Sequence, residues 1–142
     1  MGTETIVQLI LATLFGAAIG IERKLKRKEA GPQTYSLVSL GACLFGIIAF
    51  FLFEKNVIRD SSSLFIAISV GMGFIGAGTI FHKEGKIEGI TTAAGLWVTA
   101  IIGLAVGIKF YFLALATTIL VLFIFLGLGF FEKKFLKDFI KE

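Results

Sequence analysis

Glu22 is the residue of this chain whose type and position most clearly suggest chemistry. It stands between an apolar block, residues 6–21, and a basic run that starts at Arg23. A carboxylate at the end of a long apolar helix is costly unless it faces water, protein or a cation. Two interpretations stay open: an ion pair with a basic neighbour, or a pocket in which Glu22 binds a cation or a basic partner.

A second candidate is the pair Thr91 and Thr92, which follow Gly89 at the start of another apolar block. Hydroxyl groups at a helix start can cap free backbone amides, and this helix end carries partial positive charge. Capping alone would explain the pair, but such an end can also hold an anion or polarise a pocket. Trp97 would anchor at the membrane interface, line the same pocket, or do both. The candidate pocket residues are Glu22, Arg23, Thr34, Thr79, Thr91, Thr92 and Trp97.

A third feature is the glycine pattern GxGxxGxG, formed by Gly71, Gly73, Gly76 and Gly78. A nucleotide-binding fingerprint of this kind would have to link a strand to a helix in a soluble βαβ unit. The pattern lies instead inside an apolar run. It therefore favours a bare helix face on which other helices pack closely, or beside which a cavity forms. Further candidates for such packing faces are Gly16, Gly20, Gly103 and Gly107.

Other chemistry is not indicated by the residue types. There is no nucleophile–base–orienter set, no paired carboxylate spacing, and no HxxxH or CxxC motif. Cys43 is the single cysteine, which rules out an intrachain disulfide and favours a buried thiol. His82 is the single histidine, whereas a metal site usually needs a cluster of ligands. We therefore expect no catalytic residue, no metal site and no cofactor, and no enzymatic activity.

The elements that must position these residues are membrane-spanning helices. Hydrophobic residues make up 56% of the 142 and charged residues 17%, against about 45–50% and about 25% in soluble domains. The apolar residues come in blocks near the ~20 residues that cross a bilayer. We predict an all-α, polytopic bundle that contacts the lipid bilayer. Its five transmembrane helices would span residues 6–21, 36–53, 64–81, 90–108 and 110–131.

The basic residues predict how this bundle is oriented. With the N-terminus outside, the cytoplasmic side holds five Lys and Arg in the first loop, two in the third and four in the tail. Only Lys55, Arg59 and Lys109 would lie outside, as the positive-inside rule requires for an N-out, C-in protein. Because these charges flank apolar blocks rather than form a stripe on a soluble face, we expect no nucleic-acid binding. Residues 1–131 form one domain, and 132–142 a short cytoplasmic tail that could be amphipathic.

Three stretches resemble the membrane domain of the MgtC/SapB family: GIERKLKRKEAGPQTYSLVSLGACLF, GMGFIGAGTIF and GITTAAGLWVTAIIGLAVG. The resemblance implies a multi-pass protein of the bacterial inner membrane that is linked to magnesium homeostasis, growth at low magnesium and virulence. It also implies action on the F-type ATP synthase rather than transport of Mg²⁺. The motif residues in this chain are Glu22, Arg23, Ala30, Gly31, Thr34, Gly76, Gly78, Thr91, Thr92 and Trp97.

The chain departs from the family pattern in two ways. Where the family usually has AGxRT, this chain has Gln33 before Thr34, so a fixed positive charge that could contact an anion is missing. The sequence also stops about ten residues after the fifth apolar block, without the cytoplasmic C-terminal domain of the full-length virulence proteins. We therefore expect a short form with the transmembrane domain only, in which the link to ATP synthase is weaker.

Two functional hypotheses follow. In the first, the protein is a regulator that contacts a membrane complex, such as ATP synthase or a transporter, through its glycine faces. In the second, it is a small transporter or channel for a cation or solute. Its cytoplasm-facing site would be formed by Glu22 and the Thr91/Thr92 helix end. Formation of a homo-oligomer would then complete the path.

Overall fold

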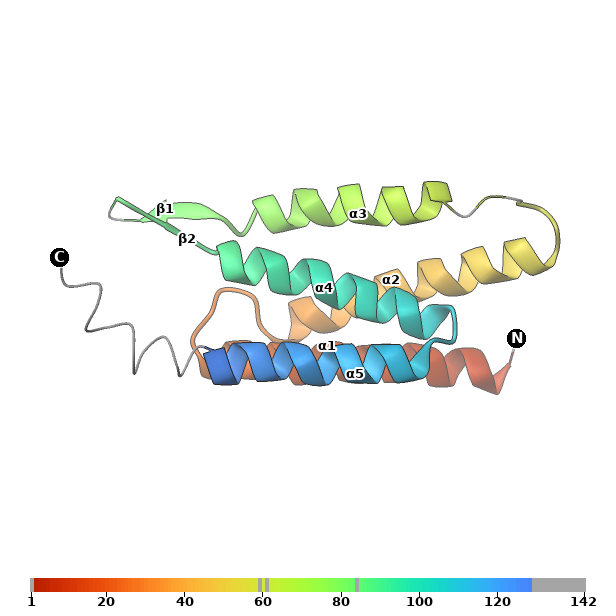
Figure 1. Ribbon diagram of the computed structural model, residues 1–142, viewed down its shortest axis with the longest axis horizontal. Helices are drawn as coiled ribbons and strands as arrows, with labels where there is room; N and C mark the ends of the chain where they lie inside the picture. The colour runs from red at the N-terminus through yellow and green to blue at the C-terminus, as the bar shows by residue number, and fades with distance from the viewer. Residues whose placement is uncertain (1, 59, 61, 84, 129–142) are drawn as a thin grey trace.

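The computed structural model describes residues 2–58, 60, 62–83 and 85–128. Five α-helices dominate the fold and run side by side along its long axis (Figure 1). A short antiparallel hairpin precedes the fourth helix, and a π-helical turn, η1, follows the fifth. The elements are α1 Thr3–Leu25, α2 Pro32–Glu54, α3 Ser62–Ala77, β1 Phe81–Lys83, β2 Lys86–Glu88, α4 Ile90–Gly107, α5 Tyr111–Phe123 and η1 Ile124–Leu128.

The all-α fold of apolar helices is confirmed. Among the described residues, four helical segments are long and apolar enough to cross a membrane: Thr3–Leu25, Pro32–Glu54, Ile90–Gly107 and Tyr111–Leu128. The third helix is also apolar but shorter over Phe65–Ala77. Segments of this length and composition are typical of a membrane protein.

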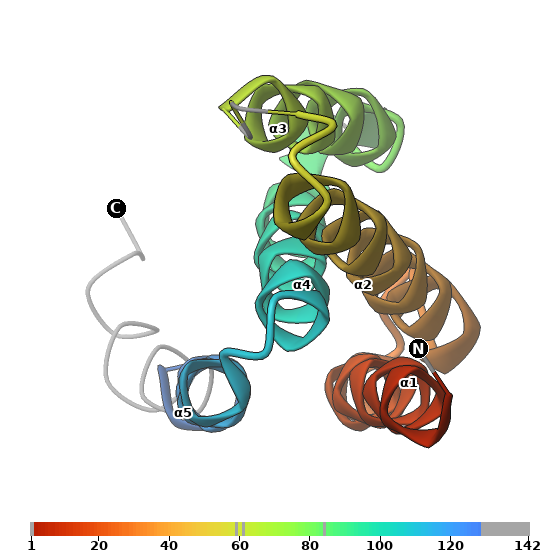
Figure 2. The same ribbon diagram turned by 90° about the vertical axis from the view of Figure 1, so that its right-hand side faces the viewer.

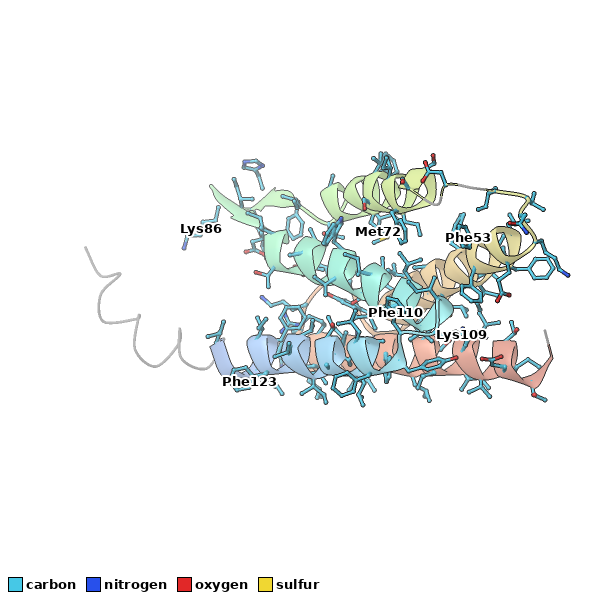
Figure 3. All side chains as sticks on the ribbon, turned by 45° about the vertical axis from the view of Figure 1, so that its right-hand side comes forward. Phe53, Met72, Lys86, Lys109, Phe110 and Phe123 are labelled. Atoms are coloured by element: carbon cyan, nitrogen blue, oxygen red, sulfur yellow. The ribbon has the colours of Figure 1, made fainter. Side chains whose placement is uncertain are left out.

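Helix α4 is the centre of the bundle and contacts α1, α2, α3 and α5. Figure 2 shows α3 at one edge, where it is joined to the bundle mainly through α4. Met72 points from α3 toward α4 (Figure 3) and is 8% exposed. Gly76 meets Ala93 of α4, to which a Cβ atom at Gly76 would come within 3.4 Å.

Helices α1 and α4 both reach the backbone of α2 through glycines. A Cβ atom added at Gly16 would lie 2.5 Å from the carbonyl oxygen of Tyr35, and one at Gly20 would lie 2.5 Å from Cα of Pro32. From the other side, Gly103 lies against Ser39, and Gly107 against Cys43. Because no side chain fits between these backbones, the three helices pack at a distance that only glycine permits.

Several helix ends differ from the sequence-based boundaries, and helix α1 is longer at both ends than the predicted 6–21. Helix α2 begins at Pro32 rather than residue 36, because proline fits the first helical position, where its missing N–H is not needed. Helix α3 ends at Ala77, four residues before the predicted end. The chain then turns into β1, which pairs with β2 through Phe81 and Glu88. The prediction of a helix up to residue 81 was therefore wrong.

Glycines with positive φ make this hairpin sharp. Gly85 (φ +79°) lies between the strands, and Gly89 (φ +92°) lies at the N-cap of α4, where a Cβ atom would overlap the carbonyl oxygen of Thr79.

At the N-terminal end of α3, the carboxylate of Asp60 accepts hydrogen bonds from the backbone N–H (2.8 Å) and hydroxyl of Ser62. These bonds lower the pKa of the Asp60 carboxyl. Residues 129–131 of the predicted fifth helix, and the predicted amphipathic tail, lie outside the described residues.

A buried polar cluster at one end of the bundle

Glu22 and Arg23 form an ion pair inside the protein, on the last turn of α1. Their side chains are 6% and 4% exposed, and Nε of Arg23 donates to Oε2 of Glu22 at 2.5 Å. The guanidinium lies over the ring of Phe125, 3.6 Å from its centroid, in cation–π geometry. Oε1 of Glu22 is buried and has no hydrogen-bond partner among the described residues. One carboxylate oxygen, Oε2, is therefore paired with Arg23, while the other, Oε1, lacks a hydrogen-bond donor among the described residues.

Helices α2 and α4 bring further polar groups to this pair. The hydroxyl of Tyr35 donates to the carbonyl oxygen of Thr92 at 3.4 Å, and the hydroxyl of Thr92 donates to Oε2 of Glu29 at 3.2 Å. Gly95 leaves room for the arrangement, since a Cβ atom there would lie 2.7 Å from both the Tyr35 hydroxyl and the Phe125 ring. We call this set the Glu22 cluster: Glu22, Arg23, Glu29, Tyr35, Thr92 and Phe125.

The structure brings three of the predicted pocket residues together, namely Glu22, Arg23 and Thr92. The remaining four make no side-chain hydrogen bond to the cluster in the described part of the chain. Thr34 and Thr91 are exposed, and Trp97 is 42% exposed. Thr79 is half-buried and donates to the carbonyl oxygen of Gly76 at 2.8 Å, just beyond the end of α3. No described side chain makes a capping hydrogen bond at the start of α4. The hydroxyl of Thr92, which was predicted as a possible cap, donates to Glu29 instead.

The predicted packing glycines fall into two groups. Gly16, Gly20, Gly103 and Gly107 lie against α2 and are used within the chain. On α3, Gly76 packs against α4. A Cβ atom added at Gly71 or Gly73 would have no other described residue of the protein within 4 Å. Gly78 follows the last residue of the helix. The glycines of α3 that face open space are thus Gly71 and Gly73.

Sequence reasoning missed several members of the cluster. Tyr35 is fully buried, with its hydroxyl directed to α4. Glu29 could have been noticed as the one acidic residue in a basic run. Phe125 gave no local signal, because its place over Arg23 depends on the π-helical turn η1 and on the space at Gly95.

At the opposite end of the bundle, α1 is tied to the end of α4. The side-chain amide of Gln8 is buried and donates to the carbonyl oxygens of Val106 (2.9 Å) and Gly107 (3.0 Å), which lie in the last turn of α4. Nearby, Lys109 forms an exposed ion pair with Glu4 at 2.9 Å, and this hydrogen bond raises the pKa of the Lys109 ammonium.

Within the described residues, no group of three or more His, Cys, Asp or Glu side chains could hold a metal ion.

Comparison with known proteins identifies the family. The profile of the MgtC family matches residues 9–134. The chain is 40% identical over 138 residues to YhiD of Escherichia coli (strain K12), a proposed magnesium transporter, covering 92% of this chain and 64% of YhiD. It is 38% identical over 125 residues to SapB of Bacillus subtilis (strain 168), covering 84% of this chain and 54% of SapB.

A third relative is MgtC of Salmonella typhimurium (strain 14028s), 39% identical over 118 residues, covering 82% of this chain and 49% of MgtC. The chain thus spans about half to two thirds of the length of these relatives. No solved structure matches it. The family profile covers most of the residues that build the bundle and the Glu22 cluster, and the chain belongs to the MgtC family.

Proposed function

We propose that this chain is a regulatory protein of the bacterial inner membrane, linked to magnesium homeostasis, that acts by contact with another membrane protein. The family relationship and the description of YhiD as a proposed magnesium transporter support the link to magnesium. The F-type ATP synthase is one candidate partner, and a transporter is another. The protein has no enzymatic role in this proposal.

The proposed topology has five crossings, with the N-terminus outside and the C-terminus inside. Helix α3 supplies the extra crossing beyond the four long segments. Its 16 residues rise about 24 Å at 1.5 Å per residue, which a tilted bundle or a local thinning of the bilayer accommodates. The concentration of Lys and Arg near one end of the bundle supports this orientation.

The observation that carries the contact hypothesis is an open stripe of small residues on α3. Ser69, Gly73 and Ala77 follow one another at intervals of four, and all three are exposed. No other described residue comes within 4 Å of the position that a Cβ atom at Gly73 would take. Apolar exposure alone would only indicate lipid contact, but small residues at this spacing let a second helix approach to backbone distance. A transmembrane helix of the partner would pack along this stripe.

Gly73→Leu tests the proposal. The larger side chain would block close approach and should reduce the recovery of the partner about tenfold or more, as a loss of ~1.4 kcal/mol would do. The measurement is affinity purification in mild detergent, with quantitative mass spectrometry of co-purifying proteins. Gly41→Leu is the matched control, because Gly41 of α2 also has no atom near a Cβ position. Equal recovery with both variants, at equal membrane insertion, would contradict the proposal.

The alternative function is a small transporter or channel for a cation or solute. The unsatisfied Oε1 of Glu22 favours it, because a buried oxygen without a donor could accept a cation. The ion pair with Arg23 weighs against it, since the charge of Glu22 is already compensated. In this alternative, a homo-oligomer completes the path, and Glu22→Gln should abolish any flux that the protein supports.

A further inference from the structure

We propose that the turn between α1 and α2 binds the phosphate groups of anionic phospholipids at the membrane surface. Its basic residues, Lys24, Lys26, Arg27 and Lys28, are all exposed, and we call them the basic loop. They lie close together in the sequence, at the end of a membrane-spanning helix. Clusters of this kind next to a membrane helix attract anionic lipid head groups. The inference does not depend on the partner contact proposed for α3.

The carboxylates closest in sequence to the basic loop are engaged by other groups of the protein. Glu22 accepts from Arg23, and Glu29 accepts from Thr92. Among the described residues, no carboxylate lies within ion-pair distance of the four basic side chains of the loop. Glu22 is paired with Arg23 inside the protein, and Glu29 adds one exposed negative charge beside four exposed positive ones, so the surface of the loop is net positive.

The backbone holds the basic loop in a tight turn. The N–H of Lys28 donates to the carbonyl oxygen of Arg23 at 3.0 Å, and that of Arg27 donates to Lys24 at 3.0 Å. Arg27 adopts a positive φ of 55°, as is common at the end of a helix. Because these bonds satisfy carbonyls of the last turn, the basic side chains are free to contact a ligand. The next helix has Gly31 as its N-cap, without a side-chain hydrogen bond, which adds partial positive charge beside the loop.

Apolar neighbours point to a lipid rather than to a nucleic acid. Ile21 is 51% exposed and Leu25 is 78% exposed, and both lie on α1 within one turn of Lys24. A lipid bound here would place its acyl chains along Ile21 and Leu25 and its phosphate at the lysines. A nucleic acid would offer the same phosphate chemistry but nothing for the aliphatic side chains to contact, since bases stack on aromatic rings. Charge and apolar surface together therefore select an anionic phospholipid.

The test compares two double variants of the purified 142-residue chain. Lys24→Gln/Lys28→Gln removes two charges from the basic loop. Lys83→Gln/Lys86→Gln is the matched control, which removes two charges from the exposed hairpin; Lys86 points away from the bundle (Figure 3). Binding of dioleoyl-phosphatidylglycerol and of dioleoyl-phosphatidylcholine to each protein in detergent is measured by native mass spectrometry. Equal melting temperatures of the three proteins in lipid-free detergent show that the fold is retained, and Arg27→Gln replaces the loop variant if it unfolds.

The expected result is that phosphatidylglycerol binds the parent chain about tenfold more tightly than phosphatidylcholine. The loop variant should lose most of this preference, whereas the hairpin variant should keep it. Equal binding of the two lipids, or equal loss in both variants, would overturn the inference. Competition by inorganic phosphate or by a single-stranded oligonucleotide at lower concentration than the lipid would also overturn it, in favour of a soluble phosphate or a nucleic acid.

Discussion

Glu22 and Arg23 form a buried ion pair that links α1 to Phe125 of η1. A buried ion pair is not in general a source of stability, because taking two charges out of water costs about as much as their attraction returns. Here the guanidinium also stacks on Phe125, and Oε1 of Glu22 stays without a donor among the described residues. The pair therefore specifies how α1 meets α5 and η1 more than it stabilises the bundle.

Single substitutions in the pair should cost more than the double substitution. Arg23→Met leaves the Glu22 carboxylate buried and uncompensated, and Glu22→Leu leaves the guanidinium in the same state. Each should lower the free energy of unfolding by about 3–5 kcal/mol, whereas the double variant should lose much less than their sum. Thermal unfolding in detergent, followed by the fluorescence of Trp97, measures the effect.

Lys109→Met is the control for this experiment, because it breaks the exposed ion pair with Glu4 and should change the melting temperature little. Additive losses in the double variant would show that Glu22 and Arg23 act independently, contrary to the geometry of the cluster.

Sequence reasoning reached part of this cluster at the level of single residues. The position of Glu22 at the end of an apolar block was sufficient to predict either a pair or a pocket, and Arg23 was the nearest partner. Tyr35 and Phe125 could not be assigned, because their contacts join α1, α2, α4 and η1, and only tertiary packing brings these segments together. Trp97 had the residue type of a pocket wall, but it lies on an exposed side of α4.

At the scale of elements, α2 is held between glycines from two neighbouring helices. Gly16 and Gly20 of α1 approach it at Tyr35 and Pro32, while Gly103 of α4 approaches it at Ser39. The periodic glycines predicted close approach, but not which helix would be approached. The hairpin was missed because Ile80 and Phe81 continue the apolar run beyond Gly78 and Thr79, the two residues that follow the end of α3 at Ala77.

Gly103→Ala should destabilise the bundle, although the added group is only a methyl. Its Cβ would overlap the backbone of Ser39, which cannot move without separating α2 from α4. Overpacking of this kind costs roughly 1–3 kcal/mol or more. Gly41→Ala should instead be neutral or stabilising by up to about 1 kcal/mol, because the site is open and alanine favours the helix. Melting temperatures in detergent compare the two, and equal losses would refute the close packing at Gly103.

At the scale of the whole molecule, the two ends of the bundle are closed by polar contacts. The Glu22 cluster occupies one end, and Gln8 joins α1 to the last turn of α4 at the other. Between them the centre is filled by α4, whose buried side chains include Leu96, Ile102 and Val106. This arrangement favours a protein that acts through its outer surface over one that conducts ions through its own interior.

The most direct test of that claim is a flux measurement with the purified chain alone. The protein is reconstituted into liposomes that enclose a magnesium-sensitive dye, and magnesium is added outside. We predict influx no faster than in protein-free liposomes, because the bundle interior is packed and the charge of Glu22 is compensated by Arg23. Influx that rises with the amount of protein and disappears in Glu22→Gln would contradict the contact mechanism and establish a conducting path through the Glu22 cluster.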